Sequence, residues 1–228
     1  MPPEQPRPAR ELPIVRAGLP RVIEIPLAAL GLLIASPFLL LAALAIAMTS
    51  PGGALFRQVR VGRGGRLFGL YKLRSMRLDA DGPALTARID ARVTSVGRWL
   101  RRTKLDELPQ LWNVLRGEMA LLGPRPEVPR YANLDDPRWR RILDVRPGIT
   151  DPLTLRLRDE DALMPVAAED RERFYLETLQ PIKLEGYLAY LATRSAWSDL
   201  AILIATALAI VRSRPMPSRE ELARRGRV

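Results

Sequence analysis

The chain has 228 residues, and its 36 Lys and Arg against 25 Asp and Glu give a net charge of +11. This length allows one domain with appendages or at most two small domains. The charge favours anionic partners such as nucleic acid, phosphorylated metabolites or the cytoplasmic face of a membrane. Cys and His are absent, which excludes disulfides, thiolate nucleophiles, Cys- or His-based metal sites and imidazole bases. Catalysis would have to use carboxylates, hydroxyls, Lys or Arg, with or without a hard metal ion.

The N-terminal region combines a basic tail with a long apolar segment. Residues 1–20 are rich in Pro and Arg and predict a tail that is disordered or lies on the surface. Residues 26–48 carry no charge and exceed the ~20 residues that span a bilayer, so residues 21–50 predict a membrane helix. Ser36-Pro37 lies at its middle, where proline removes a backbone hydrogen bond. The Ser36 hydroxyl is able to bond a carbonyl one turn back and reinforce a bend.

Arginines flank the apolar segment on both sides, and the positive-inside rule would keep both flanks in the cytoplasm. A helix that breaks at Ser36-Pro37, dips into the membrane and returns satisfies both observations. The alternative is an ordinary kinked span, since proline is tolerated in transmembrane helices. The flanking arginines are Arg7, Arg10, Arg16, Arg21, Arg57, Arg60, Arg63 and Arg66.

The segment FRQVRVGRGGRLFGLYKLRSM, residues 56–76, predicts a short β-hairpin that turns through Gly62–Gly65. A glycine turn with arginines is able to cradle phosphate, but the Walker and Rossmann spacings are absent. The pattern therefore favours a plain hairpin.

Residues 90–115 predict helix with a break near Thr103. The stretch LDELPQLWNVL has an apolar helical face, and Pro109 fits only if a helix begins just before it. Asp106 and Glu107 would then lie in the first turn, where acids stabilise a helix by ~0.3–1 kcal/mol each. Thr103 with Asp106 also fits a capping box. This interpretation gives the two acids a purely structural role.

Two further helical regions follow a turn-rich segment, which comes after residues 123–126 and contains RPGITDP at residues 146–152. Residues 171–195 predict a helical region broken by Pro181, with apolar faces, including Tyr175, assigned to the core. Residues 196–228 predict an amphipathic helix in the membrane interface, with Trp197 at headgroup depth, followed by an Arg-rich tail.

The adjacent acids also suit chemistry. A helix N-terminus with Arg101, Arg102 and Lys104 nearby would lower the pKa of a carboxyl group and keep it ionised. An ionised carboxylate suits a nucleophile or a Mg²⁺ ligand better than a general acid. Mg²⁺ held by one or two carboxylates together with substrate phosphates is usual at phosphoryl-transfer sites.

At this point the sequence resembles the bacterial sugar transferases, which are monotopic polyprenyl-phosphate phosphoglycosyl transferases. The resemblance covers residues 30–209 and rests on the hairpin segment, VGRWLRRTKLDELPQLWNVLRGEMALLGPRPE, VRPGIT and FYLETLQPIKLEGYLAYLATRSAWSDL. The short N-terminus resembles the minimal form of the family. We therefore expect an α/β, predominantly helical monotopic protein: a basic tail (residues 1–20), a re-entrant helix (21–50), a cytoplasmic catalytic domain (51–195), and an interfacial helix with a basic tail (196–228).

The resemblance implies a two-step reaction at the cytoplasmic face of the bacterial inner membrane. Asp106 attacks a UDP-sugar and releases UMP, and undecaprenyl phosphate then accepts the phosphosugar. Asp106 and Glu107 would be the Mg²⁺ ligands, and Glu107 would organise the ion or aid proton handling. Arg101 and Arg125 would hold phosphate. Lys72, Arg74 and Arg146 are further candidates for phosphate binding.

The sequence departs from the family pattern at two places. Lys104 stands where a serine is common, and GITDPLTLRLRDED (residues 148–161) replaces a segment containing glycine and asparagine. Residues 148–161 are a candidate region for selecting the sugar. Their departure from the pattern therefore predicts that the chain belongs to a distinct subgroup of the family. The sugar, the pathway and a homodimeric state are left open.

Three alternatives remain. A nucleic-acid-binding module would explain the positive charge, but the uncharged segment and the 6% aromatic content disfavour it, so no nucleic-acid partner is expected. A catalytically silent membrane scaffold would differ only at the acids and arginines. A glycosyl transferase would release UDP in place of UMP.

Overall fold

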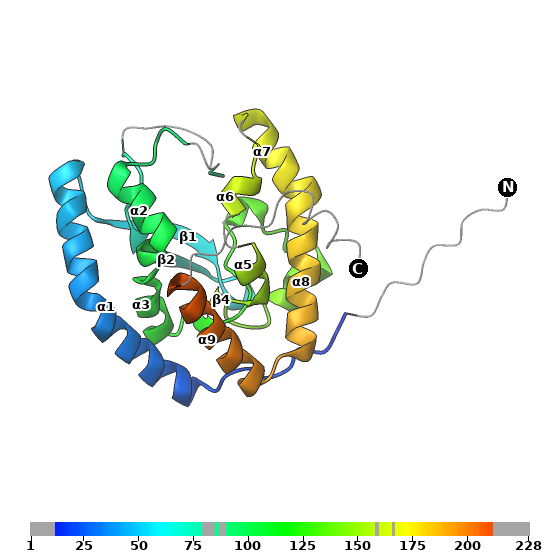
Figure 1. Cartoon of the computed structure of the whole chain (residues 1–228). Coiled ribbons are helices and arrows are strands. Elements are labelled where there is room, and N and C mark those ends of the chain that lie inside the picture. Colours follow the sequence, from blue (N-terminus) through cyan, green and yellow to red (C-terminus); the bar gives the residue numbers. More distant parts are fainter. Residues whose placement is uncertain (1–11, 79–84, 87–89, 158–159, 166, 212–228) are drawn as a thin grey trace.

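The computed structural model describes residues 12–78, 85–86, 90–157, 160–165 and 167–211. The predictions for residues 1–11, with Arg7 and Arg10, and for the Arg-rich tail at residues 212–228 lie outside the described residues. The described chain is mostly helical, as predicted, and it has two small sheets where the sequence predicted one hairpin (Figure 1).

The helices are α1 (Arg21–Thr49), α2 (Ser95–Thr103), α3 (Gln110–Leu115), α4 (Pro137–Ile142), α5 (Pro152–Arg156), α6 (Glu160–Leu163), α7 (Ala168–Phe174), α8 (Gln180–Thr193) and α9 (Ala196–Val211). The 3-10 turns are η1 (Arg63–Gly65), η2 (Leu105–Glu107) and η3 (Pro129–Tyr131), and η4 (Tyr175–Leu179) is a π turn. The strands are β1 (Leu55–Val61), β2 (Leu67–Leu73), β3 (Ala120–Leu122) and β4 (Gly148–Thr150).

The apolar helix α1 continues through Ser36-Pro37, so the predicted break is a bend, which Figure 1 shows as a change of direction. Pro37 has no N–H and cannot donate to the carbonyl of Leu33, one turn back. The Ser36 hydroxyl donates to that carbonyl at 2.8 Å, which confirms the predicted hydrogen bond. The helix stays intact because a side chain replaces the lost backbone donor.

The β-hairpin of β1 and β2 forms as predicted, with Phe56 opposite Lys72. Gly64 and Gly65 have φ of 65° and 77° in its turn, a region that glycine enters without steric cost. The free edge of β2 is closed by Asn113 of α3, whose side chain accepts from Tyr71 N (3.1 Å) and donates to Gly69 O (2.8 Å). The hairpin and α3 therefore form one unit, and α1 packs on α3 through Ala28 and Leu111.

The sequence interpretation missed the second sheet. Strands β3 and β4 pair in parallel, with Ala120 opposite Gly148 and Leu122 opposite Thr150. A Cβ on Gly148 would lie 2.1 Å from the amide nitrogen of Gly123, so only glycine fits this close approach. The segment predicted as turns thus holds a buried strand.

The predicted break at Pro181 is wrong, because the helix continues from α7 through η4 into α8. The π turn of Tyr175–Leu179 immediately precedes Pro181 and changes the hydrogen-bond pattern there. A π turn of this kind accommodates the backbone hydrogen bond that proline cannot donate, so the helix does not end there.

The described part of the N-terminal tail, residues 12–20, lies against α8 and α9. Arg16 N donates to Leu191 O at 2.9 Å, and Leu19 N donates to Asp199 Oδ2 at 2.9 Å. Tyr190 Oη donates to the other oxygen of Asp199 at 2.7 Å. Buried Asp199 therefore ties the start of α9 to the chain that leads into α1.

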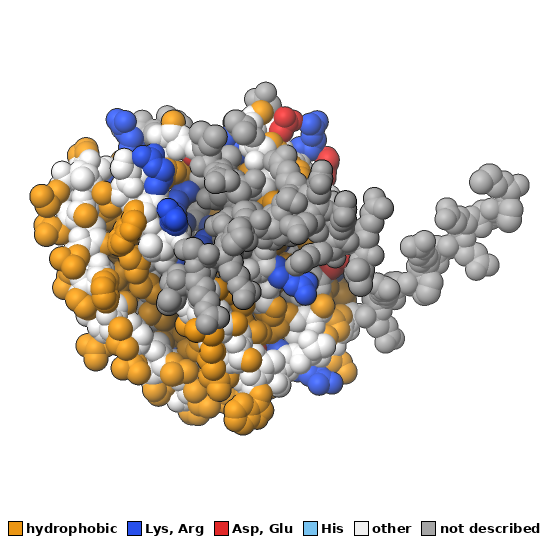
Figure 2. Space-filling model, viewed as in Figure 1, with side chains coloured by type: hydrophobic (Ala, Val, Ile, Leu, Met, Phe, Trp, Pro, Cys, Tyr) orange, Lys and Arg blue, Asp and Glu red, His pale blue; other side chains and the backbone are white. Residues whose placement is uncertain are grey.

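Helix α9 turns its polar side chains inward: Asp199 is 1% exposed, and Thr206 bonds Thr150 of β4 at 3.0 Å. Its outer face carries Trp197, 81% exposed, with Ile204 and Leu208. Figure 2 shows hydrophobic side chains gathered over α1 and α9. Among the described helices, α1 alone is long and apolar enough to cross a membrane, and α9 is shorter.

Candidate active site

The acids Asp106 and Glu107 lie in the 3-10 turn η2 between α2 and α3. Lys104 precedes this turn with φ of 59°, the one positive φ among the described non-glycine residues. The left-handed backbone conformation of Lys104 costs ~1–2 kcal/mol. It ends α2 and changes the direction of the chain before Asp106 and Glu107. The predicted capping box is wrong, because the Thr103 hydroxyl donates back to Trp99 O at 2.9 Å in α2. Helix α3 begins only after Pro109.

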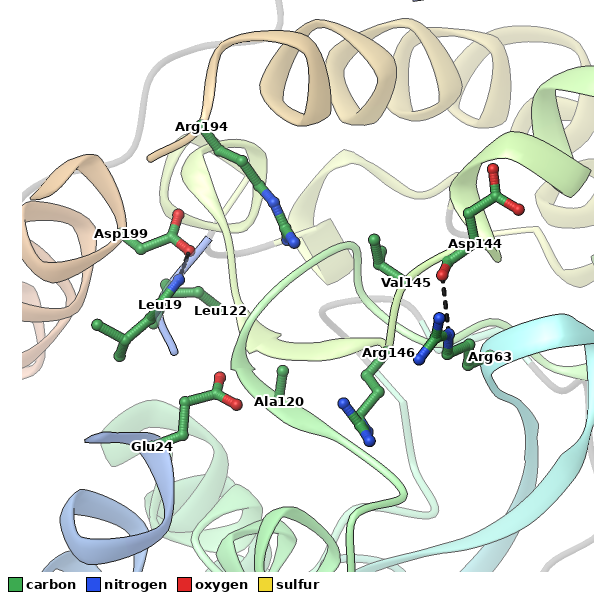
Figure 3. Close-up of a pocket in the computed structure, with 10 residues that line it drawn as sticks. All are labelled: Leu19, Glu24, Arg63, Ala120, Leu122, Asp144, Val145, Arg146, Arg194 and Asp199. Carbon is green, nitrogen blue, oxygen red and sulfur yellow. Dashed lines mark hydrogen bonds between the residues drawn. The ribbon is translucent and has the colours of Figure 1, made fainter. Parts of the chain in front are cut away.

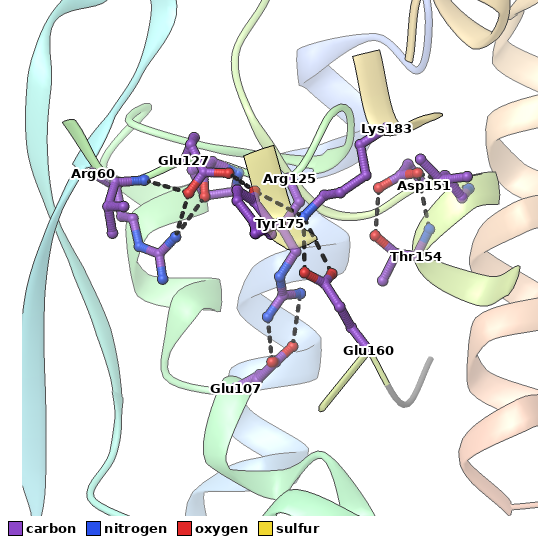
Figure 4. A network of polar contacts seen from close by, with 12 residues as sticks. Arg60, Glu107, Arg125, Glu127, Asp151, Thr154, Glu160, Tyr175 and Lys183 are labelled. Atoms are coloured by element: carbon purple, nitrogen blue, oxygen red, sulfur yellow. Dashed lines mark hydrogen bonds and ion pairs between the residues drawn. The ribbon is translucent and has the colours of Figure 1, made fainter. Parts of the chain in front are cut away.

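Glu107 forms a bidentate ion pair with Arg125 (Figure 4). Arg125 Nη1 lies 3.1 Å from Glu107 Oε2, and Nη2 binds the other oxygen. Burial opposes the charge of Glu107, but the charge and hydrogen bonds of Arg125 outweigh it and lower the pKa of Glu107 to about 2. Glu107 is therefore fully ionised and held in one orientation at neutral pH.

Asp106 differs from Glu107 in its hydrogen bonding and in the direction of its pKa shift. It is 6% exposed, and its Oδ1 is buried without a hydrogen-bond partner in the described chain. Burial, followed by the charge of Glu107, raises the pKa of Asp106 to about 6. The predicted lowering of the pKa agrees with Glu107 but is wrong for Asp106, because the depth at which a carboxyl group is buried depends on the assembled fold. At pH 7 the group is still mostly ionised, and its free oxygen is poorly solvated.

Three of the predicted cations surround the acids. Lys72 of β2 and Arg101 of α2 act on the charge of Asp106, and Arg125 acts on Glu107. Burial, together with the charge of Arg60, lowers the pKa of Lys72 to about 8. Arg101 Nε donates to Ser75 Oγ at 2.8 Å, which fixes its orientation. These residues come from β2, from α2 and from the loop after β3, three segments that are distant in sequence.

Two other predicted phosphate ligands lie elsewhere. The guanidinium of Arg74 is bonded to the carbonyls of Ser50 (2.8 Å), Pro51 (2.5 Å) and Gly52 (3.2 Å), so it anchors the chain that leaves α1. Arg146 Nε donates to Gly117 O at 2.9 Å. Its side chain lines a cavity of about 210 Å³ beside Arg63 and Glu24 (Figure 3).

A buried polar network behind Arg125 was not predicted (Figure 4). The Tyr175 hydroxyl donates to Glu127 Oε2, and Lys183 Nζ bonds the same hydroxyl at 3.3 Å. Lys183 also pairs with Glu160 at 3.1 Å, and Arg60 lies 3.8 Å from Glu127. The sequence interpretation assigned Tyr175 to the core. The available signal was a lysine eight residues after this tyrosine on one helix face.

The residues that could hold a divalent metal are few. Among the described residues, no group of three or more Asp, Glu, His or Cys side chains could hold a metal ion. The free oxygen of Asp106 fits a hard cation that is otherwise held by water and substrate phosphate. Both oxygens of Glu107 are already bound to Arg125.

Comparison with known proteins decides the family, because residues 15–213 match the bacterial sugar transferase family. The chain belongs to the bacterial sugar transferase family. The predicted resemblance is thus confirmed, as is the prediction of an enzyme of this class.

Several relatives of this sugar transferase have names that specify a reaction. A UDP-glucose:undecaprenyl-phosphate glucose-1-phosphate transferase of Caulobacter vibrioides is 41% identical over 88% of the chain and 73% of its own length. A protein of the same name from Escherichia coli (strain K12) is 36% identical over 82% of the chain and 39% of its own length. A UDP-N-acetylgalactosamine-undecaprenyl-phosphate N-acetylgalactosaminephosphotransferase of Aeromonas hydrophila is 40% identical over 60% of the chain and 33% of its own length.

Proposed function

We propose that the protein transfers a phosphosugar from a UDP-sugar to undecaprenyl phosphate, releasing UMP, through a covalent intermediate on Asp106. The observation that carries the proposal is that Oδ1 of Asp106 is buried without a hydrogen bond, next to Glu107, which is ion-paired with Arg125. The names of the Caulobacter and Aeromonas relatives describe the same class of transfer with two different sugars.

In the first step, an oxygen of the Asp106 carboxylate attacks the phosphorus that bears the sugar. The bond from that phosphorus to the bridging oxygen breaks, and UMP leaves with the electron pair. In the second step, a phosphate oxygen of the polyprenol attacks the same phosphorus and displaces the carboxylate. This is covalent catalysis in two displacements, and it regenerates Asp106.

The surrounding side chains give each step its electrostatic support. Lys72 and Arg101 flank Asp106 with positive charge, and fixed cations stabilise charge that develops on a transferring phosphoryl group. Arg125 pairs with Glu107 and offsets part of its negative charge, which limits repulsion between Glu107 and an incoming phosphate. Arg74 and Arg146 are bonded to backbone carbonyls, so their part in phosphate binding stays a prediction.

The family expectation of Mg²⁺ fits one free carboxylate oxygen on Asp106 together with the substrate diphosphate. When bound there, the ion would neutralise diphosphate charge. Glu107 would orient Arg125 in place of binding the ion directly, because both of its oxygens are occupied. This division of roles refines the expectation that both acids are metal ligands.

We also propose a monotopic arrangement at the cytoplasmic face of the inner membrane, with α1 (within residues 21–50) re-entrant, a catalytic domain at residues 51–195, and α9 (within residues 196–228) in the interface. The bend in α1, the Ser36 bond to Leu33 and the apolar face over α1 and α9 support it. Arginine-rich flanks at both ends of α1 favour the same side of the membrane.

Nucleotide release tests this function. Purified protein in nanodiscs receives Mg²⁺, undecaprenyl phosphate and a panel of UDP-sugars, with Asp106→Asn in parallel. UMP from at least one donor, lowered roughly 10³-fold or more in the variant, is the expected result. UDP would indicate a glycosyl transferase, and no nucleotide from any donor would favour a silent scaffold.

A further inference from the structure

A second basic hollow lies away from the acids. It has a volume of about 540 Å³ and opens between the hairpin turn and the turn that links α3 to β3. Among the described residues that line it, Glu118 is the one carboxylate, and it is already bonded to Asn113 (2.7 Å) and Arg116 (3.3 Å). The hollow is therefore strongly positive, because four arginines line it: Arg63, Arg66, Arg116 and Arg146.

Two of these arginines are held in place by backbone carbonyls. Arg63 Nε donates to Asp144 O at 2.9 Å, and Arg146 Nε donates to Gly117 O at 2.9 Å. Within the described chain, their terminal Nη groups form no hydrogen bond, and neither does the guanidinium of Arg66. A guanidinium anchored through Nε presents its remaining N–H groups in a fixed fork that matches a phosphate.

The hollow is distinct from the acid pair. Phe68 lines the hollow, and Lys72, on the same strand β2, flanks the acids. Phe68 and Lys72 are four residues apart along the strand, which corresponds to ~13 Å. The charges with the largest effects on the pKa values of Asp106 and Glu107 belong to other cations: Lys72, Arg101, Lys104 and Arg125. An anion in the hollow would therefore not be the reacting phosphate.

The surroundings of the hollow indicate a membrane ligand. Leu67 lines it and is 61% exposed, on the same hairpin face as Val59 at 50% and Leu55 at 60%. Basic pockets beside apolar surface are typical sites for anionic lipid headgroups. We propose that this hollow binds the phosphate of an anionic phospholipid and so anchors the hairpin at the membrane surface, independently of catalysis.

The test uses the full chain in a neutral detergent. Short-chain phosphatidylglycerol and phosphatidylcholine are titrated separately, and the dissociation constant is measured from the shift in thermal unfolding. The variant Arg66→Gln/Arg116→Gln removes two arginines of the hollow. Its matched control, Arg130→Gln/Arg173→Gln, removes two exposed arginines that pair with Glu172 and Asp170.

We expect phosphatidylglycerol to bind the native protein and the control equally, and the hollow variant to bind it roughly tenfold or more weakly. Phosphatidylcholine should bind none of them, and inorganic pyrophosphate should displace phosphatidylglycerol. Equal phosphatidylglycerol binding by both double variants would overturn the site. Pyrophosphate binding lost in the hollow variant, without any phosphatidylglycerol binding, would overturn the lipid in favour of a soluble phosphate.

Two further measurements separate loss of binding from loss of fold or of catalysis. Arg66→Lys/Arg116→Lys keeps the charge, so it should recover part of the phosphatidylglycerol affinity if the hollow acts through charge. UMP release by the glutamine variant should match the native protein in the same detergent. These results would keep the lipid site and the proposed transferase reaction independently testable.

Discussion

Arg125 binds both carboxylate oxygens of Glu107, while Oδ1 of the adjacent Asp106 is buried without a hydrogen-bond partner in the described chain. Two neighbouring acids therefore have opposite properties: the pKa of Glu107 falls to about 2 and that of Asp106 rises to about 6. Separated pKa values of this kind indicate separate roles. In the proposed reaction, Glu107 orients Arg125, and Asp106 supplies the free carboxylate oxygen.

Replacing Arg125 tests this pairing. Arg125→Ala leaves Glu107 charged in a mostly buried position, and breaking such a pair costs ~3 kcal/mol. For a chain of this size, thermal unfolding should occur roughly 6–12 °C lower. Arg130→Ala, which breaks an exposed pair with Glu172, should cost less than ~1 kcal/mol. Equal effects of the two substitutions would contradict the assigned role of Arg125.

The pH dependence of kcat/KM should be bell-shaped. The proposed reaction needs Asp106 ionised, so activity should rise with pH through about 6. It also needs Lys72 protonated to attract phosphate, so it should fall as pH rises through about 8. Lys72→Arg should remove the falling limb, because a guanidinium keeps its charge. A Lys72→Arg profile that falls at the same pH as the native one would exclude Lys72 as the group responsible.

Replacing Asp106, the proposed nucleophile, should stabilise the fold at neutral pH. The folded protein binds the Asp106 proton more tightly than the unfolded chain, so stability is lost as pH rises from about 4 to about 6. Asp106→Asn avoids the buried charge and should gain ~1–3 kcal/mol near neutral pH. The difference should shrink toward zero below about pH 4, where the Asp106 carboxyl is protonated in both the folded and the unfolded chain. Thermal unfolding of the two proteins across this range measures it, and a pH-independent difference would contradict the buried charge.

Sequence patterns within a short stretch predicted the elements that are formed by neighbouring residues. The hairpin follows from alternation and its glycine turn, and the bend in α1 follows from Ser36-Pro37. Strands β3 and β4 were missed because each has three residues and pairs across a long separation, with Ala120 opposite Gly148. Periodicity cannot detect so short a strand.

The acids were predicted from sequence, but their electrostatics were not. The pKa of Asp106 is raised because the residue is buried in the turn η2, which packs against β2 and α2, and burial of that kind is a property of the assembled fold. The same holds for the network of Glu127, Tyr175 and Lys183, whose members lie on two separate segments.

The topology of α1 can be tested by labelling, since the chain has no native cysteine. Ile14→Cys and Gly53→Cys place one thiol on each side of α1. In intact cells an impermeant maleimide should label neither, and in inverted membrane vesicles it should label both. Adding Pro37→Ala should straighten the helix and expose one of the two sites in intact cells. Labelling of one site without that change would mean that α1 spans the membrane.

Trapping the intermediate tests the central claim most directly. The protein is incubated with UDP-sugars labelled at the sugar-proximal phosphate, without polyprenyl phosphate, and the quenched chain is analysed by intact mass and peptide mapping. We predict one phosphosugar on the peptide that contains Asp106, its loss when undecaprenyl phosphate is added, and no adduct on Asp106→Asn. Turnover without any adduct, or an adduct that persists in Asp106→Asn, would contradict covalent catalysis by Asp106.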